Sequence, residues 1–146
     1  MLYIASDHAG FQLKKYLAQR LKNDLEIEVK DLGPKNIDEN DDFPDFAAPL
    51  SKQVTKSDKN FGILICGSGH GMCIAANKIK GARAIVGYSI QGAELARKHN
   101  NANILCLAGR ILSEEHALAV TKTFLTTKFE AEPRFVRRNK KISQLE

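Results

Sequence analysis

The segment from residue 61 to residue 71, FGILICGSGHG, constrains the fold of this chain more than any other part. Its first six residues are uncharged and almost all apolar, which is typical of a strand buried on both faces of a parallel sheet. Three glycines then alternate with Ser68 and His70. Glycines at such a turn let backbone N–H groups approach a ligand closely. The segment therefore predicts a buried strand that leads through a ligand-binding loop into a helix.

The hydrophobic pattern along the rest of the chain switches repeatedly between strand and helix periods. Strands that alternate with helices indicate βαβ units around a parallel sheet. We expect one α/β domain over residues 1–146, a Rossmann-like three-layer α/β/α sandwich with a five-stranded parallel sheet and a C-terminal helical tail over residues 132–146. The expected strands are 2–6, 26–31, 61–66, 82–87 and 103–108, and the expected helices are 11–21, 43–54 (capped by Asp42), 72–80, 91–99 and 114–126.

The charge of the chain points to a small anionic ligand rather than to nucleic acid. The formal net charge is +5, and the last nineteen residues hold six Lys or Arg against three Glu. No stacking aromatic residues are interleaved with these basic residues, and tryptophan is absent, so a nucleic-acid surface is not expected.

Three features that the sequence lacks predict the cellular compartment of the protein. No apolar run approaches the roughly 18 residues of a membrane span, so no membrane partner is expected. The first residues carry no basic leader, and the three cysteines show no CxxC spacing, which argues against a signal peptide, a disulfide framework and a zinc site. The sequence predicts a cytoplasmic protein.

Cys66 is the strongest candidate for chemistry, because ligands of such sheets bind beyond the carboxyl ends of the strands. The N–H groups of the glycine loop and the helix N-terminus should favour the thiolate form of Cys66 and stabilise a nearby oxyanion. A buried cysteine in a tight turn is the open alternative, and core packing is expected for Cys73 and Cys106. The loop fits neither a dinucleotide fingerprint, since its spacing is GxGxG, nor a Walker loop, since no Gly-Lys-Ser/Thr follows.

Two further polar pairs allow two interpretations each. Asp7 and His8 directly follow the first strand, where they are either acid–base groups for a sugar hydroxyl or a helix N-cap with an exposed neighbour. His99 and Asn100 end a helix, where they are either site residues or groups that offset the helix dipole and cap its C-terminus.

Arginines near the end of the chain form a candidate phosphate site. Arg134, Arg137 and Arg138 share one face of the expected last helix, and forked guanidinium groups suit a phosphate dianion. Arg110, just after the fifth strand, is positioned to join them, and a solvated basic tail is the alternative. Together with the base and the oxyanion loop, these residues meet the requirements of an aldose–ketose phosphate isomerisation, which needs no metal and no cofactor.

The chain resembles the family of type B ribose-5-phosphate isomerases and galactose-6-phosphate isomerase subunits. The resemblance runs through residues 6–10 (SDHAG), 42–47 (DFPDFA), 62–78 (GILICGSGHGMCIAANK), 96–103 (ARKHNNAN), 109–110 and the tail arginines. It implies interconversion of ribose 5-phosphate and ribulose 5-phosphate through a cis-enediolate, in the non-oxidative pentose phosphate pathway. It also implies a homodimer or homotetramer whose sites are shared between subunits, with His99, Asn100 and Arg110 supplied by the neighbour of the chain that supplies Cys66.

The resemblance also implies a role for each matching residue. Cys66 is the base that moves the proton between C1 and C2, and His99 opens the sugar ring with the help of Asp7. The other implied roles are enediolate stabilisation by the loop amides and the Ser68 hydroxyl (Gly67, Ser68, Gly69, His70, Gly71), sugar binding by Asn100, and phosphate binding by His8, Arg110, Arg134 and Arg138.

The chain departs from the family pattern in two places. Phe43 stands where many members have tyrosine, and residues 130–135 read EAEPRF where the family usually reads EGGRH. Three other functions remain as alternatives: an isomerase of six-carbon phosphosugars, a Cys66/His99 thiol hydrolase, and a binding module that retains the phosphate site without catalysis.

Overall fold

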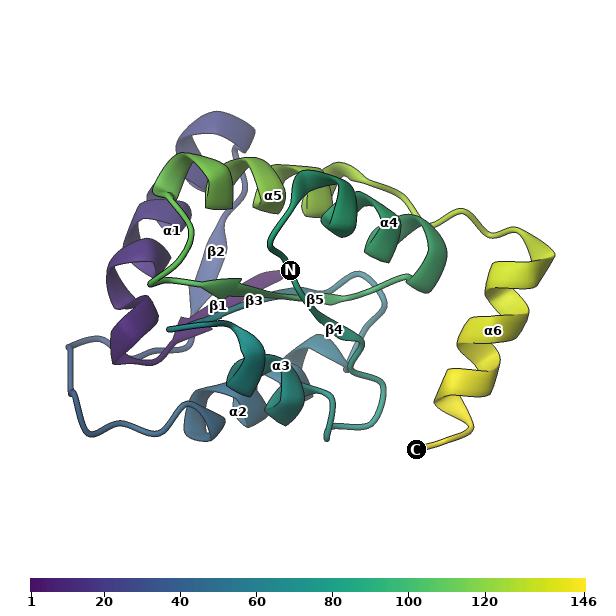
Figure 1. Cartoon of the computed structure of the whole chain (residues 1–146), viewed down its shortest axis with the longest axis horizontal. Helices are drawn as coiled ribbons and strands as arrows, with labels where there is room; N and C mark the ends of the chain where they lie inside the picture. The colour runs from purple at the N-terminus through teal and green to yellow at the C-terminus, as the bar shows by residue number, and fades with distance from the viewer.

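A five-stranded parallel sheet forms the centre of the protein, in a computed structural model that describes all 146 residues. Its strand order is β2-β1-β3-β5-β4 (Figure 1). All neighbouring strands are parallel, which confirms the predicted five-stranded parallel sheet. The second strand is shorter than residues 26–31. The strands are β1 (Leu2–Ser6), β2 (Val29–Asp31), β3 (Phe61–Cys66), β4 (Ala84–Val86) and β5 (Ile104–Ala108).

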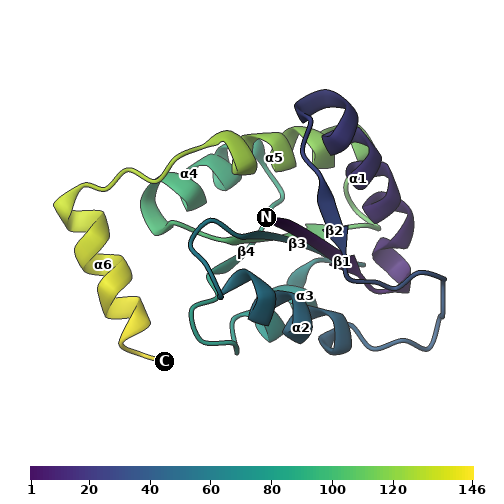
Figure 2. The same ribbon diagram turned by 180° about the vertical axis from the view of Figure 1, so that it is seen from behind.

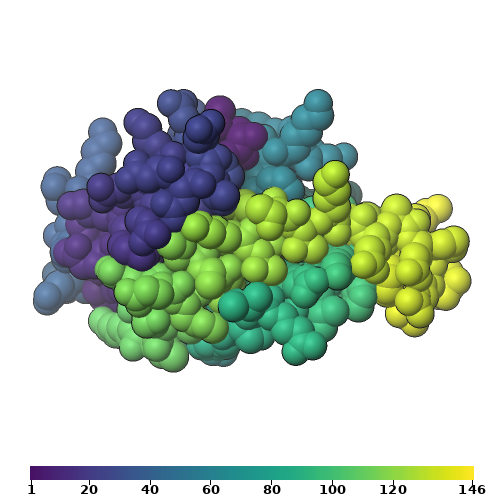
Figure 3. Space-filling model, turned by 90° about the horizontal axis from the view of Figure 1, so that it is seen from above, coloured from purple at the N-terminus to yellow at the C-terminus, as the bar shows by residue number.

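Helices cover both faces of the sheet, as Figures 1 and 2 show from opposite sides. One face carries α1 (Phe11–Leu25), α4 (Ile90–Asn100) and α5 (Glu114–Thr126), and the other carries α2 (Pro44–Val54) and α3 (His70–Ala76). A short 3-10 turn, η1 (His8–Gly10), precedes α1. The last helix, α6 (Pro133–Ser143), projects from the body of the molecule (Figure 3). None of these helices has the length and apolar character that crossing a membrane requires.

The side chains of β3 explain why its sequence is continuously apolar. Ile63 and Ile65 pack with α1, α4 and α5, whereas Leu64 and Cys66 pack with α2 and α3. Since successive strand residues point to opposite faces, a strand covered on both sides requires apolar residues at every position.

Several helix ends differ from the prediction because proline and residues with a positive φ determine them. The cap of α2 is Phe43, which forms no side-chain capping bond, and Pro44 starts the helix, so the prediction of Asp42 as the cap is wrong. Gly69 has a φ of 81°, and α3 begins directly after it, two residues earlier than expected. At the end of α4 the left-handed residue is Asn101 (φ 47°), so Asn100 is the last helical residue and not the cap.

The strand order creates a switch point between β1 and β3. From β1 the chain moves outward to β2, and it then returns to the other side of β1 for β3. In open α/β sheets the crevice at such a point, at the carboxyl ends of the strands, is the usual ligand site. Asp7 directly follows β1 and Cys66 ends β3, so the fold brings both residues to this crevice.

Lys14 joins α1 to the edge strand β2 through a buried ammonium group. Its side chain is 1% exposed, and Nζ lies 2.8 Å from both carboxylate oxygens of Asp31 and 2.6 Å from the Pro34 carbonyl oxygen. A buried charge must be paired, because an unpaired ion inside a protein is strongly destabilising. The short strand β2 therefore depends on this ion pair as well as on its backbone hydrogen bonds.

Asp31→Ala should lower the free energy of unfolding by about 2 kcal/mol, since it removes a charged partner from the buried Lys14 ammonium. Urea unfolding followed by circular dichroism measures this loss. Lys14→Met in the same Asp31→Ala background removes the unpaired charge and should recover part of the stability. Equal stability of Asp31→Ala and the unsubstituted protein would contradict the importance of the pair.

Candidate active site

Backbone hydrogen bonds join the carboxyl ends of three strands into one rigid floor. The Asp7 N–H donates to the Ile65 carbonyl at 3.1 Å, which ties the end of β1 to β3. The Gly109 N–H donates to the Cys66 carbonyl at 2.8 Å, and the Arg110 N–H donates to the Gly67 carbonyl at 3.1 Å, which tie β5 to β3. Residues that follow these strands are therefore held side by side.

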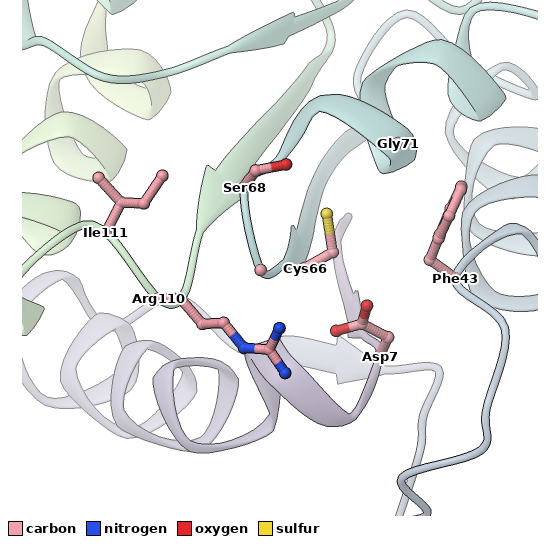
Figure 4. A pocket seen from close by; sticks show the side chains of 8 residues that line it. Asp7, Phe43, Cys66, Ser68, Gly71, Arg110 and Ile111 are labelled. Atoms are coloured by element: carbon pink, nitrogen blue, oxygen red, sulfur yellow. The ribbon is translucent and has the colours of Figure 1, made fainter.

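A cavity of about 430 Å³ opens above this floor. In Figure 4 the Cys66 thiol, the Asp7 carboxylate and the Arg110 guanidinium surround its centre, while the Phe43 ring forms one wall. A volume of this size is typical of small-molecule sites, which span about 300–1,000 Å³. The lining residues are Asp7, Phe43, Cys66, Gly67, Ser68, Gly71, Arg110 and Ile111.

Cys66 is buried at the end of β3 with its sulfur at the start of the glycine loop. The Gly69 N–H donates to Cys66 Sγ at 3.1 Å, so the loop directs a backbone donor at the thiol as the sequence predicted. Such a bond is stronger to a thiolate than to a thiol. A side chain at Gly71 would meet the Phe43 ring at about 2.7 Å, so only glycine lets that ring close the cavity wall here.

Asp7 is the N-cap of η1, as one of its two sequence interpretations predicts, and it also lines the cavity. Its Oδ1 accepts the Gly10 N–H at 3.1 Å and so caps η1, and the same side chain lines the cavity. Burial raises the pKa of the Asp7 carboxyl above its ordinary value, although the hydrogen bond from Gly10 opposes the shift. A carboxyl group with a raised pKa is suited to proton transfer.

His8 is held by Asp41, a residue that sequence reasoning did not single out. Asp41 Oδ1 lies 2.6 Å from His8 Nδ1 and accepts the His8 N–H at 3.1 Å. The hydrogen bond to Asp41 raises the pKa of the His8 imidazole, because it favours the protonated ring. Asp41 lies in an acidic loop with Asp38, Glu39 and Asp42, and no local pattern distinguishes it from them.

Arg110 belongs to the same chain's cavity, contrary to the expectation that it serves the neighbour's site. The physical reason is topological, because Arg110 comes two residues after β5, which pairs directly with β3. Its side chain lies against Gly67, where a Cβ atom would be 3.4 Å from Arg110 Cδ. Cys66 and Arg110 thus bring a thiol and a cation to one cavity.

His99, Asn100 and the tail arginines lie elsewhere in the chain. α4 runs back from the carboxyl edge of the sheet and rises about 1.5 Å per residue, so its last residues lie at the amino edge. There His99 stacks on Phe135 (ring centroids 4.3 Å apart), and Asn100 lines a separate cavity of about 210 Å³ with Ile142. Arg134 and Arg138 are exposed on α6, which lies at the same far end of the molecule (Figures 1 and 2).

The arrangement does not support a thiol hydrolase within one chain, because none of the four imidazole rings is hydrogen-bonded to the Cys66 thiol. His8 is bound to Asp41, His70 Nδ1 lies 3.1 Å from the Ser68 carbonyl oxygen, and His116 Nε2 lies 2.9 Å from the Tyr88 carbonyl oxygen. Nor do three or more His, Cys, Asp or Glu side chains gather into a group that could hold a metal ion.

Tyr88, which sequence reasoning did not single out, lies beside the glycine loop and outside the lining of the cavity. Its hydroxyl donates to the Ser68 carbonyl at 2.7 Å, and its ring lies beside His70 with centroids 5.7 Å apart. The available signal was its position, since Tyr88 follows β4 at the carboxyl edge of the sheet, where ligand-site residues gather.

Comparisons with known proteins agree on one family. The sequence model described as Ribose/Galactose Isomerase matches residues 2–142. Ribose-5-phosphate isomerase B of Mycobacterium tuberculosis is 38% identical over 137 residues, covering 94% of this chain and 84% of that protein.

Solved structures give the same result. The crystal structure of ribose-5-phosphate isomerase B from Mycoplasma genitalium, with bound ribulose-5-phosphate, superposes with a TM-score of 0.94 at 46% identity, covering 99% of this chain and 94% of that one. The type B ribose 5-phosphate isomerase of Trypanosoma cruzi gives a TM-score of 0.93 at 38% identity, with coverage of 99% and 94%.

Asp41→Asn should lower the pKa of His8 toward the ordinary value of about 6.5, because the carboxylate that favours the protonated ring is lost. With Asp41 present, the pair stabilises the fold fully below about pH 6.5 and loses this effect as the pH rises through the raised pKa. NMR titration of the histidine ring protons measures the shift, with His116 as the internal control. If His8 titrates identically in Asp41→Asn and in the unsubstituted protein, then Asp41 does not favour the protonated His8 ring.

Proposed function

The chain belongs to the ribose/galactose isomerase family, and on this premise we propose that it interconverts D-ribose 5-phosphate and D-ribulose 5-phosphate through a cis-enediolate. Membership makes the chain an isomerase. The observation that carries the proposal is the buried Cys66 thiol facing a cavity, with the Gly69 N–H directed at its sulfur. The proposed unit is a single domain over residues 1–146 that works in the cytoplasm without a cofactor.

Cys66 acts in this proposal as the base that moves one proton. Its thiolate removes the proton from C2 of the open-chain aldose, and the electron pair left behind forms the C1–C2 double bond. The oxygen on C1 gains negative charge, which N–H groups of residues 67–71 and the Ser68 hydroxyl stabilise. The thiol then returns its proton to C1, and the proton of the C2 hydroxyl passes to the oxygen on C1, which leaves the oxygen on C2 as the ketone oxygen.

Cations at the edge of the cavity suit the phosphate of the sugar. Arg110 lines the cavity, and His8 lies next to Asp7 with its charge favoured by Asp41. Asp7 is placed to assist ring opening, since its raised pKa leaves the carboxyl able to exchange a proton. The assignment of these roles follows the family resemblance residue by residue.

A second copy of the chain completes the site in this proposal. His99, Asn100, Arg134 and Arg138 lie too far along α4 and α6 to reach the cavity of their own chain, so the partner of a homodimer or homotetramer supplies them. Exposed apolar side chains near the cavity and on α3 and α4 are available to pack in such an interface. They include Ile74, Ile90, Leu95 and Ile111.

Ketose formation from ribose 5-phosphate, measured with purified protein, tests the function. Cys66→Ala should lower kcat by about 10²-fold to 10⁴-fold, the contribution expected of a general base. Cys73→Ala is the matched control, because Cys73 Sγ donates to the Ala84 carbonyl and does not line the cavity, and its kcat should stay near that of the unsubstituted protein. An unsubstituted protein without activity on ribose 5-phosphate would overturn the proposal.

Arg138→Ala should raise KM for ribose 5-phosphate by about 10-fold to 100-fold with little change in kcat, because a phosphate anchor binds ground state and transition state alike. Arg137→Ala is the control on the same helix, since the family pattern gives Arg137 no phosphate contact. Steady-state kinetics of both variants separate the two residues. A fall in kcat alone for Arg138→Ala would place this arginine at the reacting carbons instead.

A further inference from the structure

Tyr88 is anchored beside the loop that follows Cys66. It lies in the turn between β4 and α4, and its hydroxyl donates to the Ser68 carbonyl at 2.7 Å. Its own carbonyl oxygen is 2.9 Å from His116 Nε2 on α5. The Tyr88 backbone is therefore held by α5, and the Tyr88 hydroxyl holds the loop that follows β3.

The carbonyl that Tyr88 holds belongs to the same peptide unit as the N–H that donates to Cys66. Ser68 supplies the oxygen and Gly69 supplies the N–H, whose nitrogen lies 3.1 Å from Cys66 Sγ. A trans peptide is planar, with its C=O and N–H pointing in opposite directions. The only cis peptide of the chain is Gly33–Pro34, so fixing the Ser68 oxygen also fixes the direction of the Gly69 N–H.

The bond from Tyr88 also strengthens the donor. A carbonyl that accepts a hydrogen bond polarises its peptide unit, which makes the N–H on the other side a better donor. Other charged or titratable groups lie near these bonds: Asp7 and Arg110 line the cavity of Cys66, and Cys106 is buried on the neighbouring strand β5. His70 Nδ1 lies 3.1 Å from the Ser68 oxygen and 3.4 Å from the Tyr88 hydroxyl. The Gly69 N–H differs from these groups because it forms a direct hydrogen bond to the sulfur.

We propose that Tyr88 is a positioning residue for Cys66, whose hydroxyl acts through the Ser68–Gly69 peptide to hold the N–H that stabilises the thiolate. The proposal deepens the proposed function. Only the expected change in kcat rests on the proposed function, because the hydrogen bonds that connect Tyr88 to Cys66 exist without substrate.

Tyr88→Phe tests the proposal by removing one oxygen atom. The rate at which iodoacetamide alkylates Cys66, identified by peptide mass spectrometry, should fall about threefold to tenfold at neutral pH, and its pH profile should move to higher pH. The kcat for ribose 5-phosphate should fall by a similar factor with KM within twofold. Tyr16→Phe is the matched control, since the Tyr16 hydroxyl accepts a bond from Arg20 on α1, away from the cavity.

The alkylation of Cys66 tests the positioning role of Tyr88, and the kinetics on ribose 5-phosphate test the isomerase function separately. A Tyr88→Phe protein whose alkylation profile matches that of the unsubstituted protein would overturn the proposal, whatever its kcat. A shifted profile with an unchanged kcat, or with a change in KM alone, would overturn the kinetic role of Tyr88. A shifted profile in a protein that lacks activity on ribose 5-phosphate would uphold the positioning of Cys66 and reject the isomerase function.

Discussion

The site depends on the backbone hydrogen bonds that connect the carboxyl ends of β1, β3 and β5. They place Asp7, Cys66 and Arg110 around one cavity, although these residues are far apart in sequence. The side chains then need few contacts of their own to be aligned, because the sheet that carries them is rigid. This arrangement is a general advantage of building polar sites on the ends of buried parallel strands.

Glycines make this close approach possible. A Cβ atom at Gly10 would lie 2.5 Å from the Ile65 carbonyl oxygen, and one at Gly109 would lie 2.7 Å from the Ala9 carbonyl oxygen. Both distances are shorter than any stable contact, so a side chain at either position would separate the loops. The glycines that follow β1 and β5 therefore serve packing, whereas after β3 Gly69 directs its N–H at Cys66 Sγ and Gly71 makes room for the Phe43 ring.

The sequence was sufficient for the sheet, the layers and the Cys66 loop, because these follow from local periodicity and from glycine spacing. It was insufficient wherever the place of a residue depends on contacts between segments that are distant in sequence. The pairing of β5 with β3 puts Arg110 in its own chain's cavity, and no local pattern reports which strands are neighbours. Asp41 and Tyr88 were missed for the same reason, since each acts on a residue that is distant in sequence. The helix caps at Phe43 and Asn101 differ by one residue from expectation, which is the usual uncertainty of helix ends.

The position of His99 at the far end of α4 has a consequence for how activity depends on concentration. If each reaction centre combines Cys66 of one chain with His99 of another, an isolated chain holds two incomplete halves and no whole centre. Catalysis would then follow mass action, with specific activity falling as dilution separates the subunits. Subunit association would in this way set the lowest protein concentration at which the enzyme can work.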